Sequence, residues 1–116
     1  NVFDLIDAIG SQNNKKAFEL LYRELKTGRD PYYILTMIIY QFRNLIVIKD
    51  LQRQKYSESE IVGKAKLRPF VVKKALRNPL KFDHMAKIYG HLLSVDFGFK
   101  MGNFNLEDSL YDLTLK

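Results

Sequence analysis

The sequence predicts an all-α fold, a compact bundle of about five to seven helices built around a long central helix near residues 31–54. Apolar residues recur at helical spacing along the 116 residues, and β-branched residues lie inside that period instead of alternating as in a strand. Capping residues and glycines divide the pattern into segments. We therefore expect residues 1–116 to form a single helical domain.

The first two predicted helices are short and amphipathic. Residues 2–9 carry apolar side chains at helical spacing, and we expect Gly10 to take the left-handed conformation that ends this helix. Asn13 or Asn14 can cap the next helix, and Thr27-Gly28 stops it.

The segment from Asp30 to Leu51, DPYYILTMIIYQFRNLIVIKDL, predicts one long helix. Asp30 can cap its free amides, and Pro31 suits the first helical position. Apolar residues occupy more than one side of this helix, so we expect neighbours to pack on it from several directions. It is not a membrane span, because polar residues such as Arg43 interrupt an apolar run shorter than the roughly 20 residues that a bilayer requires.

Two short helices follow the central one. Ser57 and Glu60 have the spacing of a capping box, which predicts a helix over about residues 58–65. Pro69 starts the next helix, and Asn78-Pro79 ends it because a residue before proline avoids helical angles.

Two more helices complete the chain. We expect Asp83 to cap a long helix from about residue 84 to Met101, and Asn105 to cap a final one. The long helix has two neighbouring apolar stripes, the first made of Met85, Ile88, Leu92, Val95 and Phe99, the second of Ala86, Tyr89, Leu93 and Phe97.

Composition narrows the possible functions. The chain has no cysteine, so it has no disulfide framework and no thiol nucleophile. None of the six glycines forms a phosphate-binding loop, and the two histidines lack partners for a metal site, so we expect no catalytic residue, cofactor or metal. Because the chain begins without methionine inside a helical pattern, we also expect it to be part of a longer protein.

The net charge of +6 is concentrated in one stretch. No acidic residue lies between Glu60 and Asp83, and a local excess of cations can attract phosphate backbones. Residues 57–77 could also form a helix-turn-helix, although their outer face carries lysines, which supply point charge more than base recognition. The candidate nucleic-acid contacts are Lys66, Arg68, Lys73, Lys74 and Arg77. An ordinary solvated face is the alternative.

Several segments together resemble a known family. These are FDLIDAI, the long central segment, PFVVKKAL and DFGFKMGNFNLEDSLYDLTL. The most specific pieces are QFRNL, PFVVKKAL and the Asp96-x-x-x-Lys100-x-Gly102 spacing. In order and spacing they are similar to the C-terminal domain of the delta subunit of the bacterial DNA polymerase III clamp loader.

The resemblance implies a non-catalytic, cytoplasmic bacterial domain that helps to hold five subunits in a ring-shaped collar. It implies gamma/tau-type and delta-prime-type subunits as partners within a DNA-directed DNA polymerase holoenzyme. Contact with the sliding clamp would be made only by upstream domains. The alternative function is a helical nucleic-acid-binding module that uses residues 64–81 for nonspecific contact with DNA.

A collar domain needs apolar surface beyond its own core. We predict that the interface with other subunits includes Phe97, Phe99, Phe104, Tyr111 and Leu115. We also predict structural roles for an Asp96–Lys100 pair at i,i+4 spacing and for Arg43, which must reach solvent, a helix C-terminus, a carboxylate or an adjacent subunit.

Overall fold

A computed structural model describes residues 2–103 and 105–115, which form seven helices and no strand. The helices are α1 (Val2–Gly10), α2 (Asn14–Lys26), α3 (Pro31–Arg53), α4 (Glu58–Ala65), α5 (Pro69–Arg77), α6 (Phe82–Lys100) and α7 (Leu106–Leu113). The all-α prediction and the long central helix are therefore confirmed.

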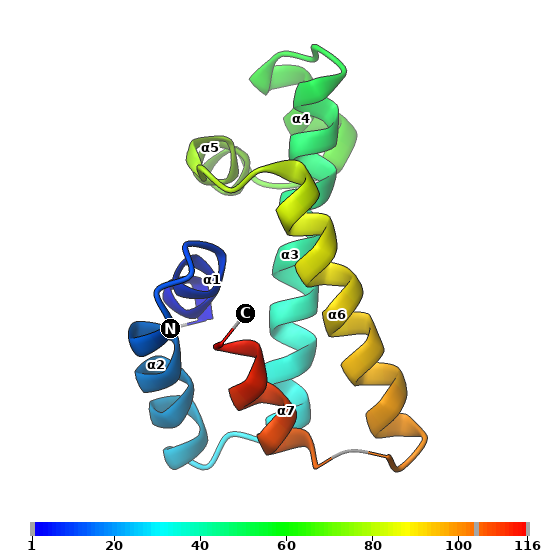
Figure 1. Ribbon diagram of the computed structural model, residues 1–116. Coiled ribbons are helices and arrows are strands. Elements are labelled where there is room, and N and C mark those ends of the chain that lie inside the picture. The colour runs from blue at the N-terminus through cyan, green and yellow to red at the C-terminus, as the bar shows by residue number, and fades with distance from the viewer. Residues whose placement is uncertain (1, 104, 116) are drawn as a thin grey trace.

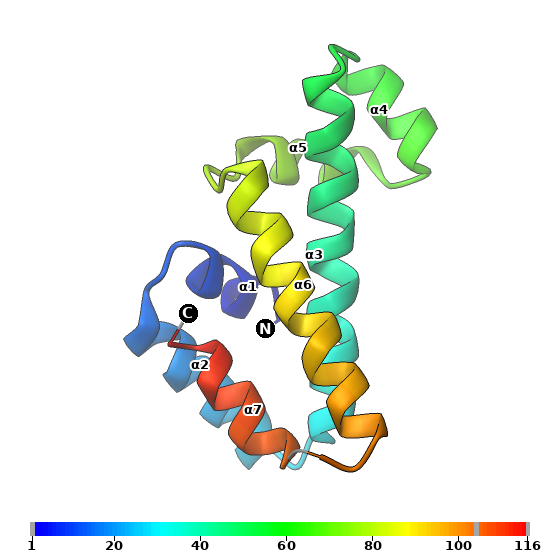
Figure 2. The same cartoon turned by 45° about the vertical axis from the view of Figure 1, so that its right-hand side comes forward.

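Helix α3 is the centre of the fold and contacts α1, α4, α5, α6 and α7 (Figure 1). Helix α6 runs beside it, α4 and α5 pack near its C-terminal end, and α1, α2 and α7 gather around the other half (Figure 2). The side chains of Leu35, Ile38, Phe42 and Ile48 are at most 1% exposed, so α3 is packed from several directions, as its apolar pattern predicts.

Local capping rules fix several helix ends. Asn13 caps α2, Asp30 caps α3 and Asn105 caps α7, each by accepting a backbone N–H in the first turn. The predicted capping box also forms, because Ser57 Oγ accepts the Glu60 N–H and Glu60 Oε1 accepts the Ser57 N–H.

Two predicted helix ends are wrong. Gln12, with φ of 60°, takes the left-handed conformation after α1, while Gly10 belongs to the helix. A Cβ on Gly10 would lie 3.1 Å from Leu80 Cδ2, so this glycine allows close packing. Asp83 does not cap α6 but lies in its first turn, because the helix begins at Phe82, whose ring centroid lies 4.0 Å from the Arg53 guanidinium.

Candidate functional site

The described residues leave many large apolar side chains on the surface after the core is filled. Among those at least 36% exposed are Phe3, Phe18, Tyr22, Tyr33, Tyr40, Phe70, Leu93, Phe97, Phe99, Met101 and Leu115. Isolated apolar side chains on a surface are ordinary, so the informative question is which of these form a continuous face.

Helix α6 carries such a face. Of its two predicted stripes, the first is buried from Met85 to Val95. In the second stripe, Leu93 is 44% and Phe97 65% exposed. Met101, four residues further at the C-cap of the helix, is 62% exposed. Residues at this spacing lie on one side of a helix, so these three side chains form a solvent-facing apolar strip, which we call the α6 strip.

Helix α3 places two more aromatic side chains at the surface. Tyr33 is 48% and Tyr40 51% exposed, and their separation of seven residues puts them on the same side of the helix. Because α3 and α6 lie side by side, the two helices together present more apolar surface than the core requires (Figures 1 and 2).

The C-terminal end of α6 is tied to the start of α3. Tyr32 Oη donates to Asp96 Oδ1 at 2.9 Å, and Lys100 Nζ lies 3.1 Å from Asp96 Oδ2. The interaction of Lys100 with Asp96, and to a lesser extent with Tyr32, raises the pKa of Lys100 above its ordinary value. The predicted i,i+4 pair therefore exists, and it belongs to a three-residue link that precedes the left-handed turn at Gly102.

The predicted aromatic interface residues do not all behave alike. Phe97 is freely exposed, whereas Phe99 stacks on Tyr32 with ring centroids 5.3 Å apart. Tyr111 packs on Phe18 of α2 with centroids 4.9 Å apart, and burial, followed by Glu107 and Tyr22, raises the pKa of Tyr111. Phe104 lies outside the described residues.

Leu115 is 67% exposed and follows α7, whose C-terminal end lies near α1 and away from the C-terminal end of α6 (Figure 1). The residues predicted as one cluster are therefore divided between α6 and the C-terminal end of the chain. Which of them contact a partner stays a prediction.

Arg43 projects to solvent, one of the outcomes its position allowed. The contact with a helix C-terminus that we considered for it is made by Lys49, whose Nζ donates to the carbonyls of Asn78 (2.7 Å) and Leu76 (3.4 Å). Burial lowers the pKa of Lys49, and the carbonyls at the end of α5 offset part of that cost. Lys49 thereby joins α3 to α5.

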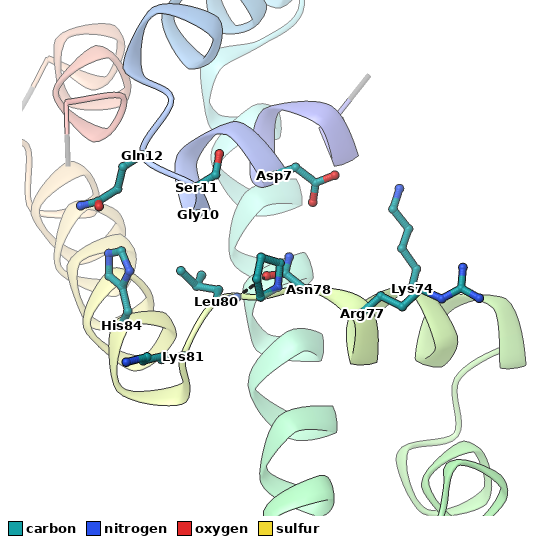
Figure 3. A pocket seen from close by; sticks show the side chains of 11 residues that line it. Asp7, Gly10, Ser11, Gln12, Lys74, Arg77, Asn78, Leu80, Lys81 and His84 are labelled. Atoms are coloured by element: carbon teal, nitrogen blue, oxygen red, sulfur yellow. Dashed lines mark hydrogen bonds between the residues drawn. The ribbon is translucent and has the colours of Figure 1, made fainter.

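All five predicted nucleic-acid contacts are exposed. Lys66 takes the left-handed conformation after α4, and Arg68 holds the N-cap position of α5. Lys74 points from α5 toward α1, and its Nζ lies 4.7 Å from the ring centroid of Phe3 (Figure 3).

Lys74 and Arg77 also line a hollow of about 710 Å³ between α1, α5 and the start of α6. Lys81 comes to it from the N-cap position before α6, His84 from α6 itself and Asp7 from α1 (Figure 3). The structure thus extends the basic stretch to a surface formed by three helices, which the sequence did not reveal.

The residues 2–103 and 105–115 contain no group of three histidine or carboxylate side chains placed to hold a metal ion. Within the same residues, no helix is long and apolar enough to cross a membrane.

Comparisons with known proteins agree with one another. A family model described as DNA polymerase III delta subunit, C-terminal domain, matches residues 1–116. The chain is 29% identical over 104 residues to DNA polymerase III subunit delta of Bacillus subtilis (strain 168), covering 88% of this chain and 30% of that protein. The fold is similar to that of the Bacillus subtilis DNA clamp loader delta protein, with a TM-score of 0.86, 26% identity, and coverage of 100% of this chain and 36% of the other. The chain therefore spans about a third of the length of these relatives.

Proposed function

Because this chain belongs to the family of C-terminal domains of the DNA polymerase III delta subunit, we propose that it is the part of a clamp loader that holds the delta subunit in a collar with other subunits. It would not catalyse a reaction but would present a helical surface to neighbouring gamma/tau-type and delta-prime-type subunits while the sliding clamp is loaded.

The observation that carries this proposal is the α6 strip together with the exposed aromatic side chains of α3. Leu93, Phe97 and Met101 lie on one side of a helix whose opposite side already fills the core. Exposed apolar faces of this kind mark protein interaction sites, and Phe and Met are enriched in them. The hydrogen bond from Tyr32 to Asp96 and the ion pair of Asp96 with Lys100 hold the end of the strip in a fixed position, which lowers the entropy cost of docking.

The direct test is reconstitution of the chain with purified gamma/tau-type and delta-prime-type subunits, followed by size-exclusion chromatography with light scattering. We expect a complex that is lost when Leu93 and Phe97 are both changed to Ser. Tyr22→Ser is the control, because Tyr22 is aromatic and 46% exposed but lies on α2. A complex that survives the Leu93/Phe97 double change, or that fails equally with Tyr22→Ser, would argue against the α6 strip as the interface.

The second candidate function is nonspecific contact with DNA through the basic stretch. The observation that favours it is the exposure of all five candidate cations in a stretch without acidic residues. Binding to duplex DNA should then weaken steeply as salt rises and should disappear when Lys73, Lys74 and Arg77 are changed to Ala together. Assembly with the partner subunits that withstands the same triple change would assign the two surfaces to different tasks.

A further inference from the structure

A second surface feature lies away from the α6 strip, in a cleft between α1, α3 and α5. This cleft has a volume of about 460 Å³. Its walls are mainly aliphatic, and they include Ile6, Leu45, Ile48, Val71 and Ala75. A space of this size and polarity falls in the range of sites that bind ligands, which are mostly apolar with a few placed polar groups.

One polar group in this cleft has no hydrogen-bond partner among the described residues. Asn44 lines the cleft from the middle of α3 and is only 6% exposed. Its side-chain amide makes no hydrogen bond within residues 2–103 and 105–115. The amide atoms are not among the enclosed polar atoms without a partner, so they open onto the cleft, where a ligand can bring both a donor and an acceptor.

The rim of the cleft is aromatic and basic. Phe70 is 73% exposed at the start of α5, and Phe3 faces it from α1. Arg68 and Lys74 supply positive charge. The cleft shares Asp7, Lys74 and Asn78 with the hollow of Figure 3, so the apolar space continues into a surface with the further cations Arg77 and Lys81.

We propose that this cleft binds a peptide segment of a protein partner in which adjacent apolar side chains are flanked by carboxylates. The aliphatic walls accept the apolar side chains, and the peptide C=O and N–H can pair with both ends of the Asn44 amide. The carboxylates would lie against Arg68, Lys74 and the cations of the hollow, while Asp7 disfavours acidic side chains on the α1 side.

A nucleic-acid base is a poorer occupant of the same space. Single-stranded nucleic acid is held mainly by stacking of bases on aromatic faces within a basic groove. Here the rings of Phe3 and Phe70 lie at the rim, and the interior is aliphatic. The chemistry of the walls therefore favours a peptide.

The test begins with a random peptide library displayed on phage and selected on the 116-residue chain. We expect the selected peptides to carry neighbouring apolar residues next to Asp or Glu. A fluorescein-labelled peptide of the selected sequence is then titrated with the chain, and binding is measured by fluorescence anisotropy. Failure to select any such peptide overturns the proposal.

Two substitutions connect binding to the cleft. Lys74→Ala should weaken the peptide by about tenfold, whereas Lys73→Ala, on the same helix but outside the cleft lining, should leave the affinity unchanged. Asn44→Leu should also weaken the peptide by about tenfold without lowering the melting temperature of the free chain, because the amide makes no hydrogen bond with the described residues that the substitution could remove. A merely structural Asn44 would instead lower the melting temperature and leave the peptide affinity unchanged.

The remaining outcomes separate this cleft from the other surfaces. Phe97→Ala, in the α6 strip, should not change the peptide affinity, so failure of the assembly proposal and failure of this one are distinguishable. If neither Lys74→Ala nor Asn44→Leu weakens the selected peptide, the proposal is wrong. It is also wrong if the two substitutions weaken binding of labelled oligodeoxythymidylate and leave peptide binding intact.

Discussion

Substitution by alanine should affect folding at Phe42 and partner binding at Phe97, because Phe42 is 0% and Phe97 65% exposed. Phe42 lies in the middle of α3 among the buried core residues, so Phe42→Ala removes a complete set of contacts and leaves a cavity. We expect it to lower the free energy of unfolding by about 3–5 kcal/mol. The domain should still fold, because proteins of this length have about 6–17 kcal/mol of stability.

Phe97→Ala should change the stability of the free chain by less than about 0.5 kcal/mol, since most of this ring already faces water. Its effect should appear in association instead. A phenylalanine ring of about 200 Å² that is 65% exposed leaves about 130 Å² to bury, and alanine keeps roughly a third of this area. At about 25 cal/mol per Å², the loss is about 2 kcal/mol, or roughly thirtyfold in the dissociation constant.

Urea denaturation followed by far-UV circular dichroism measures the first quantity, and titration calorimetry against the purified partner subunits measures the second. The assignment of core and interface would be refuted if Phe97→Ala destabilised the free chain by more than about 1 kcal/mol. It would equally be refuted if Phe42→Ala cost less than that, or if Phe97→Ala left the affinity for the partner subunits unchanged.

Three further predictions concern the stability of the free chain. Gly90→Ala should stabilise it by about 1 kcal/mol, because a Cβ on Gly90 would have no neighbouring atom within 4 Å. Gly28→Ala should destabilise it by about 1 kcal/mol, because Gly28 has φ of +90°. Thermal melts of the two variants compare them directly. The Ser57 N–H lowers the pKa of the Glu60 carboxyl by donating to it, so this stabilisation is complete above the ordinary pKa and is lost as pH falls through the lowered value. Glu60→Gln should flatten that part of the pH–stability profile, and an unchanged profile would count against the capping box. Tyr32→Phe should lower the free energy of unfolding by about 1 kcal/mol through loss of the bond between α3 and α6, as a urea titration would show, and a neutral effect would mean that water replaces it.

The helix boundaries that were predicted correctly depend on short-range chemistry. The capping box at Ser57 and Glu60 and the proline at the start of α5 act within one turn, so the residues themselves specify them. The start of α6 was predicted wrongly because the helix begins at Phe82 after Lys81, an N-cap residue without a side-chain capping bond, and Phe82 packs against Arg53, 29 residues away in the sequence. Gly10 was misassigned for a similar reason, since its role is to let Leu80 approach.

The candidate surfaces divide in the same way. Helical spacing predicted the second apolar stripe of α6, but only the packing of α6 on α3 decides that Leu93 and Phe97 face water while Leu92 does not. The cleft at Asn44 could not be predicted, because α1, α3 and α5 meet there from distant parts of the chain.

By itself, the sequence determined the helical class, the long central helix, the caps and the surplus of apolar residues, because periodicity and capping are properties of neighbouring residues. The tertiary structure decided which apolar residues stay exposed, that Lys49 and not Arg43 bonds the end of α5, and that the Asn44 amide faces a cleft without a hydrogen bond to the residues that the structure describes. These outcomes depend on which helix faces are brought together, and a side chain's solvent exposure and hydrogen-bond partners are fixed only when that packing is complete.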